Sequence, residues 1–360
     1  MPPWPPGCGA NGLRGLSGLI RKMDLMTTAE VPVAQLGRPR RFRLVVRRVA
    51  KVAGIAIVAL VVALTAASFG YNLATGGRAP RPAHLLFAKG GGWDTRYLEW
   101  GTHGTPVVLV PGAFETADTF AKLGPLLAQD HRVFAIDLSG TGYSAPNPPF
   151  SAGHFARQIL SFLAAEKLAG PQAPVLVGHS AGAADIGIAA LQDPKSVRGV
   201  VFLDGDATPL PFPAFLGTIA STLFINPYKT SVLRLALSQD WLIRNLYNSM
   251  CGPTCPQLDE AGVNTWRWPL EQPGFQAEIT YSMRNGITAM TSAQFLALKA
   301  ANVPKLVVAG TSDPEMPHSD AALTAHRIGA PPPVYVPGQH LTMIASPHQV
   351  AAAIDSLGDR

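Results

Sequence analysis

Charged residues, cysteines and sequence repeats are all scarce in this chain. Asp, Glu, Lys and Arg together make up only 14% of the 360 residues and hydrophobic residues make up 47%, which excludes a largely disordered protein. Three cysteines cannot hold a fold of this size together, so a hydrophobic core must do so. There is no internal repeat, no cluster of metal ligands and no phosphate-binding glycine loop, so we expect neither a metal nor an organic cofactor.

The net charge of +6 is concentrated at one end of the chain. Residues 1–51 hold ten Lys and Arg against two acidic residues, whereas the remainder holds 19 basic against 21 acidic residues. The main body therefore lacks the basic surface that nucleic-acid binding requires. Because residues 1–51 are also rich in proline at their start and show no apolar periodicity, we interpret them as a disordered, basic cytoplasmic tail.

An uncharged segment of 19 residues runs from Val52 to Gly70. As a helix it would be about 28 Å long, close to the thickness of the hydrocarbon layer of a bilayer. Basic residues precede it and the next one afterwards is Arg78, so the positive-inside rule predicts a single-pass membrane protein with its N-terminus in the cytoplasm and the rest outside. We assign residues 52–71 to a transmembrane helix or signal anchor. Small residues at 65–68 leave a cleavable signal as the alternative, which would make the protein secreted.

Two of the three cysteines, Cys251 and Cys255, lie on the predicted outer side, separated by the turn-forming residues 252–254. An oxidising compartment favours a disulfide between them, and two free thiols are the alternative.

Short apolar runs recur through the exported part of the chain. Runs of three or four residues without polar alternation are typical of parallel strands that are buried on both faces. We therefore predict, after a linker over residues 72–92, an α/β core over 93–206 and 303–360 with a mostly parallel central sheet flanked by helices. Arg96–Trp100 should add an antiparallel edge strand. The runs are Val107–Val110, Val133–Ile136, Val175–Val177, Val200–Leu203, Leu306–Ala309 and Val334–Val336.

The interval between the runs that end at Leu203 and begin at Leu306 is too long for a simple crossover connection. Residues 207–302 are therefore predicted to be inserted as a helical cap, or lid, with helices over Ser231–Tyr247 and Thr291–Ala301. This segment holds 11 of the 28 aromatic residues, which favours a substrate with an apolar group.

A G-x-S-x-G pattern, Gly178-His-Ser-Ala-Gly182, follows the Val175–Val177 run and precedes a helical segment rich in small residues. A strand, a sharp turn and a helix in this order form the nucleophile elbow of serine hydrolases. The turn lifts the hydroxyl of Ser180 above the sheet edge and next to the N-terminus of a helix, where negative charge is stabilised. We therefore predict that Ser180 is a nucleophile, with His179 turned away from the chemistry.

A serine hydroxyl needs a base, and the base needs a carboxylate to orient it. His340, in a loop after the last predicted strand, has the position expected of the base. Asp313 directly follows the Leu306–Ala309 run and is the preferred acid, because it completes the chain order of nucleophile, acid and base. Asp204, after the Leu203 run, is the alternative acid.

An oxyanion hole is the remaining requirement for acyl transfer. Pro111-Gly-Ala-Phe114 follows the first core run, so the backbone N–H of Ala113, together with that of Ala181, is predicted to form the hole. Glu115 in the same loop is interpreted as a solvated side chain, with contact to substrate as the alternative.

At these residues the sequence resembles the α/β-hydrolase superfamily, specifically its capped serine-hydrolase branch. The resemblance covers residues 93–358 and rests on four segments, namely 108–113, 137–144, 178–182 and 338–340. It implies an α/β-hydrolase fold. Members commonly have histidine before the oxyanion glycine, where this chain has Pro111, so the subfamily stays open. A serine nucleophile differs from the aspartate of the epoxide hydrolases and haloalkane dehalogenases.

The resemblance implies a carboxylesterase or lipase-like enzyme of class EC 3.1.1 that works through a Ser-His-Asp triad and an acyl-enzyme. Two alternatives remain. In an amidase or aminopeptidase, the cap acids Glu260, Glu271 or Glu278 would bind a substrate amine. A non-catalytic binding protein of the same fold is the other. The expected partners are a small-molecule ester or amide and the membrane, through residues 52–71.

Overall fold

The computed structural model describes residues 40–76, 80–210, 225–287 and 289–358. Most of the tail predicted over residues 1–51 lies outside these ranges, as do three of the cap aromatics, Phe212, Phe215 and Phe224. The chain divides into two units, Met1–Val61 and Val62–Arg360, which are described separately below.

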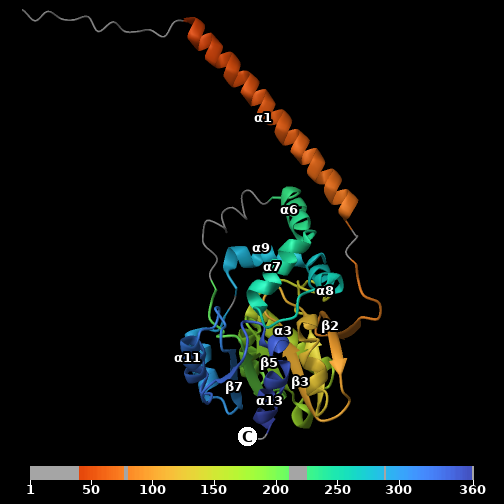
Figure 1. The fold of residues 1–360 in the computed structure, drawn as a ribbon, viewed down its shortest axis with the longest axis vertical. Helices are drawn as coiled ribbons and strands as arrows, with labels where there is room; N and C mark the ends of the chain where they lie inside the picture. The colour runs from red at the N-terminus through yellow and green to blue at the C-terminus, as the bar shows by residue number, and fades with distance from the viewer. Residues whose placement is uncertain (1–39, 77–79, 211–224, 288, 359–360) are drawn as a thin grey trace, which may run out of the picture. The chain divides into compact units, whose positions relative to one another are not determined.

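The described part of the first unit is helical. Its helix, α1 (Arg40–Thr75), continues without a break into the residues of the second unit (Figure 1). Residues 40–51, expected to belong to a disordered tail, are therefore helical. The reason is local, since neither proline nor glycine occurs between Arg40 and Ala53, and Arg, Leu and Ala favour a helix. Among the described residues, α1 is the one helix long and apolar enough to cross a membrane.

The second unit is built on an eight-stranded sheet with the order β1-β2-β4-β3-β5-β6-β7-β8. All pairs from β4 to β8 are parallel, and β2 pairs antiparallel with β4, as predicted for Arg96–Trp100. The prediction that this strand lies at the edge is wrong, because β1 pairs with its other side. Each predicted apolar run lies in a strand, which confirms the predicted fold class. The strands are β1 (Leu86–Gly90), β2 (Trp93–Trp100), β3 (Thr105–Val110), β4 (His131–Ile136), β5 (Val175–His179), β6 (Gly199–Leu203), β7 (Lys305–Gly310) and β8 (Val334–Val336).

Strand β1 lies in the segment predicted as a linker over residues 72–92. It pairs antiparallel with β2, and Gly90 stands opposite Trp93 at the turn. The two residues between them, Gly91 and Gly92, have φ angles of 57° and 84°, which side chains disfavour and which close a two-residue hairpin. The glycines therefore form the tight turn of a hairpin within the segment predicted as a linker.

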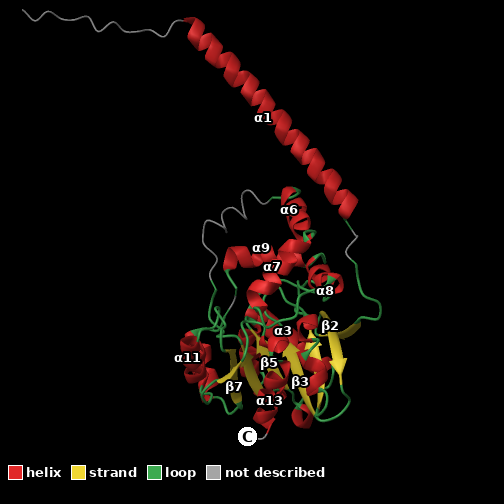
Figure 2. Cartoon of the chain, viewed as in Figure 1, coloured by secondary structure: helices red, strands yellow, loops and turns green. Residues whose placement is uncertain are grey.

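Helices cover both faces of the sheet (Figure 2). Along β3, Val108 and Val110 point into one buried cluster with α3, α4 and α11, whereas Val107 and Leu109 point into another with α2, α12 and α13. Because both faces are buried, these strands show apolar runs without polar alternation. The helices are η2 (Ala117–Phe120), α2 (Leu123–Leu127), α3 (Ala152–Ala165), η3 (Gly170–Gln172), α4 (Gly182–Gln192), η4 (Pro194–Ser196), α11 (His318–Ile328), α12 (Thr342–Ala345) and α13 (Pro347–Gly358).

The long segment between β6 and β7 is helical where it is described. The helix predicted over Ser231–Tyr247 is two helices, separated at Ser238 and Gln239. Residues of four of these helices pack with one another through Leu237, Ile243, Val263 and Phe275. The helices are α6 (Tyr228–Leu237), α7 (Asp240–Cys251), α8 (Glu260–Leu270), α9 (Phe275–Asn285) and α10 (Ser292–Ala300).

Helix α10 belongs with the core, although its sequence was assigned to the cap. Its side chains Phe295 and Leu298 join the buried cluster that also contains residues of α4 and α11. A capping box of Thr291 and Gln294 fixes its start.

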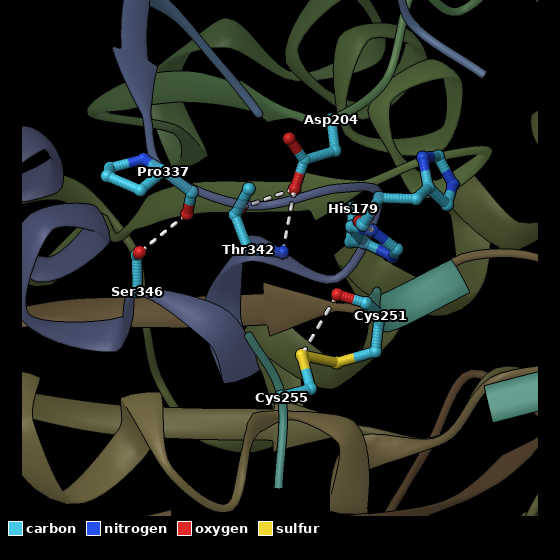
Figure 3. Close-up of a disulfide and its surroundings, with 8 residues drawn as sticks. His179, Asp204, Cys251, Cys255, Pro337, Thr342 and Ser346 are labelled. Carbon is cyan, nitrogen blue, oxygen red and sulfur yellow. Dashed lines mark hydrogen bonds between the residues drawn. A yellow bond between two sulfur atoms is a disulfide. The ribbon is translucent and has the colours of Figure 1, made fainter. Parts of the chain in front are cut away.

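A disulfide joins Cys251, at the end of α7, to Cys255 (Figure 3). Both cysteines are buried in the same cluster as the side chains of α12 and α13. Gly252 between them approaches Gln339 so closely that a Cβ there would lie 2.7 Å from the Gln339 side chain. The bridged turn at the end of α7 therefore packs against the loop that carries His340.

Helix α9 places one acidic side chain, Glu278, in the interior. Glu278 is 4% exposed, and its Cβ packs against the loop after β4, near Gly140. Burial raises the pKa of Glu278 to about 8, against a smaller opposing effect of a hydrogen bond with Thr141. Burial also raises the pKa of Asp185 on α4, and the charge of Glu278 adds to this. The interface between α9 and the core is therefore most stable with Glu278 protonated.

We predict that Glu278→Gln removes a pH-dependent loss of stability. The pKa of Glu278 in the folded protein lies above its unfolded value, so its stabilising effect is complete below about pH 4.5 and is lost as the pH rises through about 8. Each pH unit in this window should change the difference in unfolding free energy between wild type and variant by up to about 1.4 kcal/mol. Chemical denaturation from pH 5 to 8 measures it. Glu260→Gln, at an exposed position in α8, is the control, and parallel curves for wild type and Glu278→Gln would contradict the prediction.

Candidate active site

Ser180 stands in the turn between β5 and α4 with a φ of 49°, in the left-handed region that side chains disfavour. Its N–H donates to the carbonyl oxygen of Leu203 on the adjacent strand, at 2.9 Å. A Cβ at Gly178 would lie 2.3 Å from the Gly182 carbonyl oxygen, and one at Gly182 would lie 2.5 Å from the Pro111 carbonyl oxygen. Both positions therefore require glycine, as the pattern predicted.

The side chains of Ser180, His340 and Asp313 form one hydrogen-bonded chain. Nε2 of His340 lies 2.9 Å from the Ser180 hydroxyl, and its Nδ1 lies 2.9 Å from Oδ2 of Asp313. The three residues follow β5, β8 and β7. Because the carboxyl ends of parallel strands share one edge of the sheet, residues up to 160 positions apart in the sequence meet there.

The imidazole and the carboxylate change each other's proton affinity. Burial lowers the pKa of His340, but the hydrogen bond and charge of Asp313 outweigh burial and raise it, with a further contribution from Glu315. Burial raises the pKa of Asp313, but its hydrogen bond and charge interaction with His340 outweigh that effect and lower it. The pair therefore favours an imidazolium next to a carboxylate, the charge state that appears when His340 accepts a proton.

Asp204, the alternative acid, does not contact the His340 ring in this structure. Its Oδ1 accepts a hydrogen bond from the Gly310 N–H at 2.9 Å, and its Oδ2 accepts from the N–H and the hydroxyl of Thr342 (Figure 3). Burial is the main cause that raises the pKa of Asp204 to about 7. Asp204 thus joins the end of β6 to the end of β7 and to the start of α12.

Ala113 and Ala181, the predicted oxyanion donors, both line the cavity that contains Ser180. The loop after β3 lies so close to the elbow that a Cβ on Gly112 would be 2.9 Å from Cβ of Ser180. Phe114, the next residue but one, has a φ of 63°, which makes the loop turn sharply. Two backbone segments distant in sequence therefore lie side by side around the serine.

The prediction that Glu115 is a solvated loop residue is wrong. It is 4% exposed, and its Oε2 lies 2.7 Å from Nδ1 of His179, which is fully buried. His179 does not line the cavity, but its ring lies against that of His340, and its Nε2 faces the backbone oxygen of His340 at 2.8 Å. Nothing local in the sequence signals this ion pair, because its partners lie 64 residues apart and meet only after β3 and β5 pair.

The cavity at Ser180 has a volume of about 670 Å³. Its apolar lining comes from side chains such as Met250, Ile287 and Met316, and the described aromatics of the 207–302 segment do not line it. The described aromatics of that segment pack elsewhere: Tyr247 contacts Trp266 within the segment, whereas Phe275 and Tyr281 contact Phe114 and Phe150 of the core. No group of His, Cys, Asp and Glu in the described ranges is arranged to hold a metal ion.

The acids predicted as amine binders are not at the cavity. Glu260 and Glu271 do not line it, and Glu278 is buried against the core. The acids that do line it, besides the buried Glu115 and Asp204, are Asp206 and Glu315. Glu315 is half exposed and has Oε2 at 3.5 Å from Nε2 of His340.

Residues 107–353 match the model of a family described as "Alpha/beta hydrolase family". A curated relative, the serine hydrolase-like protein of Danio rerio, is 31% identical over 144 residues, which cover 38% of this chain and 40% of that protein. The chain therefore spans less than half the length of that relative.

Two solved structures resemble the chain in fold. A serine hydrolase involved in carbazole degradation has a TM-score of 0.60 and 21% identity, and the match covers 77% of this chain and 98% of that one. A membrane phospholipase A has a TM-score of 0.59 and 19% identity, with 89% and 98% covered. Because the family model matches well over half of its residues, this chain belongs to the alpha/beta hydrolase family.

Proposed function

We propose that this protein is a membrane-anchored, extracytoplasmic serine hydrolase that cleaves carboxylic esters. The observation that carries the proposal is the hydrogen-bonded chain of Ser180, His340 and Asp313, with both contacts at 2.9 Å, at a cavity of about 670 Å³. Membership of the alpha/beta hydrolase family supports it. A nucleophile, its base and an acid behind the base are the parts that acyl transfer requires.

In the first half of the reaction, the Ser180 oxygen attacks the ester carbonyl carbon while Nε2 of His340 accepts the hydroxyl proton. Asp313 holds the imidazole in the correct orientation and stabilises the imidazolium. The carbonyl oxygen becomes an oxyanion, which the N–H groups of Ala113 and Ala181 bind. The tetrahedral intermediate then collapses, and His340 gives its proton to the departing alkoxide, which leaves an acyl-enzyme and an alcohol.

In the second half, a water molecule takes the place of the alcohol. His340 removes a proton from the water as the water oxygen attacks the acyl carbon. The new oxyanion binds at the same site as before. The bond to Ser180 breaks, the serine oxygen recovers its proton from His340, and a carboxylic acid is released. The enzyme returns to its starting state without a cofactor.

The cavity lining supports an ester with an apolar group. Met250, Ile287 and Met316 offer an apolar surface to an acyl or alcohol group. The presence of Asp206 and Glu315 in the cavity lining favours the second candidate, an amidase or aminopeptidase, because a carboxylate binds a substrate amine. We favour the ester, since the side chain of Asp206 already accepts hydrogen bonds from the N–H and the hydroxyl of Thr208.

The anchor in this proposal is α1. Its long apolar run, preceded by arginines, supports a single span with the N-terminus in the cytoplasm. Within the second unit, Asn72 donates to the carbonyl oxygen of Pro227 at 2.9 Å, and the hydroxyls of Ser68 and Ser231 lie 2.5 Å apart. The segment of α1 at the end of the uncharged run is thus bound to α6. The disulfide also suits an oxidising compartment.

Ser180→Ala should abolish both covalent labelling by a fluorophosphonate and turnover of p-nitrophenyl esters, because the attacking oxygen is removed. We expect a loss of at least about 10³-fold in kcat/KM. The full chain in detergent is assayed across acyl-chain lengths, with aminoacyl anilides in parallel. Faster turnover of the anilides would favour the aminopeptidase, and a wild-type protein that the probe does not label would favour a binding protein.

Asp313→Asn should lower kcat by about 10³ to 10⁴-fold while the melting temperature changes little, because the imidazole loses the carboxylate that stabilises its charged form. The carboxylate raises the pKa of His340, so the acidic limb of the pH profile should move to lower pH in the variant. Asp204→Asn is the matched control and should cost about tenfold or less, since Asp204 acts through the backbone. If Asp204→Asn gives the larger loss and the shifted profile, the acid is assigned wrongly.

A membrane-impermeant maleimide should label Ser238→Cys, but not Ser17→Cys, when it is added to intact cells. Ser238 is exposed at the end of α6, on the proposed outer side, and position 17 precedes the span. Both variants are made in a Cys8→Ser background, and lysis should make position 17 reactive. The opposite pattern would mean that the topology is inverted, and labelled protein in the medium would mean that the anchor is cleaved.

A further inference from the structure

Glu115 and His179 form an ion pair that the proposed mechanism does not use. Both side chains are in the interior, at 4% and 0% exposure, and the His179 ring packs on the His340 ring with 4.9 Å between the ring centres. A buried ion pair is costly to desolvate and contributes little to stability by itself, so its presence beside a reactive site calls for another reason.

The contacts of His179 define its protonation state. Nδ1 faces Oε2 of Glu115 at 2.7 Å, and Nε2 faces the backbone oxygen of His340 at 2.8 Å. Both partners are acceptors, so both ring nitrogens must carry a proton for both hydrogen bonds to exist. His179 is therefore an imidazolium, and the carboxylate of Glu115 neutralises it.

Glu115 in turn holds the oxyanion loop at two points. Its Oε2 accepts a hydrogen bond from the Gly112 N–H at 3.1 Å, and its own N–H donates to the Gly112 carbonyl oxygen at 3.2 Å. The peptide bond from Gly112 to Ala113 is planar, so the direction of that carbonyl also fixes the direction of the Ala113 N–H. That N–H is the proposed donor to the oxyanion.

The other end of the pair holds the base. His340 is bound through its own carbonyl oxygen, and Ser180 directly follows His179 in the chain. The loops after β3, β5 and β8 thus meet at a single charged unit. We propose that the Glu115–His179 ion pair is a positioning pair, which keeps the Ala113 N–H and the His340 ring aligned with Ser180; this inference rests on the proposed function.

Loss of the His179 proton should break this arrangement. The charged groups that face His179 are Glu115 from the loop after β3, His340 from the loop after β8 and Asp204 from the end of β6. Burial lowers the pKa of His179, and the carboxylate of Glu115 outweighs that effect and raises it. A neutral His179 has one N–H, so at alkaline pH either Glu115 or the His340 carbonyl loses its donor.

Glu115→Gln tests this with nearly unchanged shape. The second-order rate of fluorophosphonate labelling and the ester kcat should fall by about tenfold or more at pH 8, while KM changes by less than about threefold. The alkaline limb of the kcat profile should move to lower pH by about one unit or more, because Gln no longer raises the pKa of His179. Glu99→Gln, which removes a carboxylate paired with Arg132 away from the site, is the matched control. A uniform loss at all pH values, or an unchanged profile, overturns the proposal.

A second measurement needs no turnover. In ¹⁵N-labelled Ser180→Ala protein, His179 should show two protonated ring nitrogens at pH 7 to 8, assigned by their absence in a Ser180→Ala/His179→Gln variant. One protonated nitrogen would overturn the proposal even if the enzyme hydrolyses esters. Two protonated nitrogens in this variant, together with a wild-type protein that the fluorophosphonate does not label, would leave the ion pair intact and place the failure in the proposed function.

Discussion

The turn at Ser180 exists only because three backbone segments approach one another with almost no room for side chains. The serine has a φ of 49°, the carbonyl of Gly182 occupies the space above Gly178, and the carbonyl of Pro111 occupies the space above Gly182. This crowding holds a disfavoured conformation in place. It also brings the loop after β3 against the serine, so the same packing that lifts the hydroxyl puts Ala113 and Ala181, the proposed oxyanion donors, on the wall of the same cavity.

The parallel sheet then decides which distant residues can take part. Strands β5, β6, β7 and β8 all end at the same edge, and each is followed by a polar residue of the site. Two of these residues are aspartates with different surroundings. Asp313 lies against the imidazole, whereas Asp204 is occupied by the N–H of Gly310 and by Thr342. Both residues are aspartates, so their positions along the sheet edge decide their roles: Asp313 is the proposed acid, and Asp204 binds backbone N–H groups.

Charge is balanced locally around the two buried histidines of the site. The two imidazole rings lie 4.9 Å apart, yet each has its own carboxylate, Glu115 for His179 and Asp313 for His340. Two imidazolium groups this close would repel each other if either carboxylate were absent. The balance allows His340 to accept a proton while His179 stays charged. In the proposed mechanism, the charge of His179 and Glu115 next to the base therefore stays constant while His340 gains and loses a proton.

The sequence by itself determined the class of fold and placed Ser180 and His340, because apolar runs, the G-x-S-x-G pattern and the position of His340 after the last run are features of the linear chain. It left two aspartates as candidate acids, and only the tertiary structure put Asp313 and not Asp204 against the imidazole. The tertiary structure decided what depends on partners far away in sequence. It made Gly91 and Gly92 a hairpin turn, joined α10 to the core, left the cap acids away from the cavity and buried Glu115 against His179. A local pattern fixes backbone conformation, whereas the burial and charge state of a side chain are set by whichever segments fold against it.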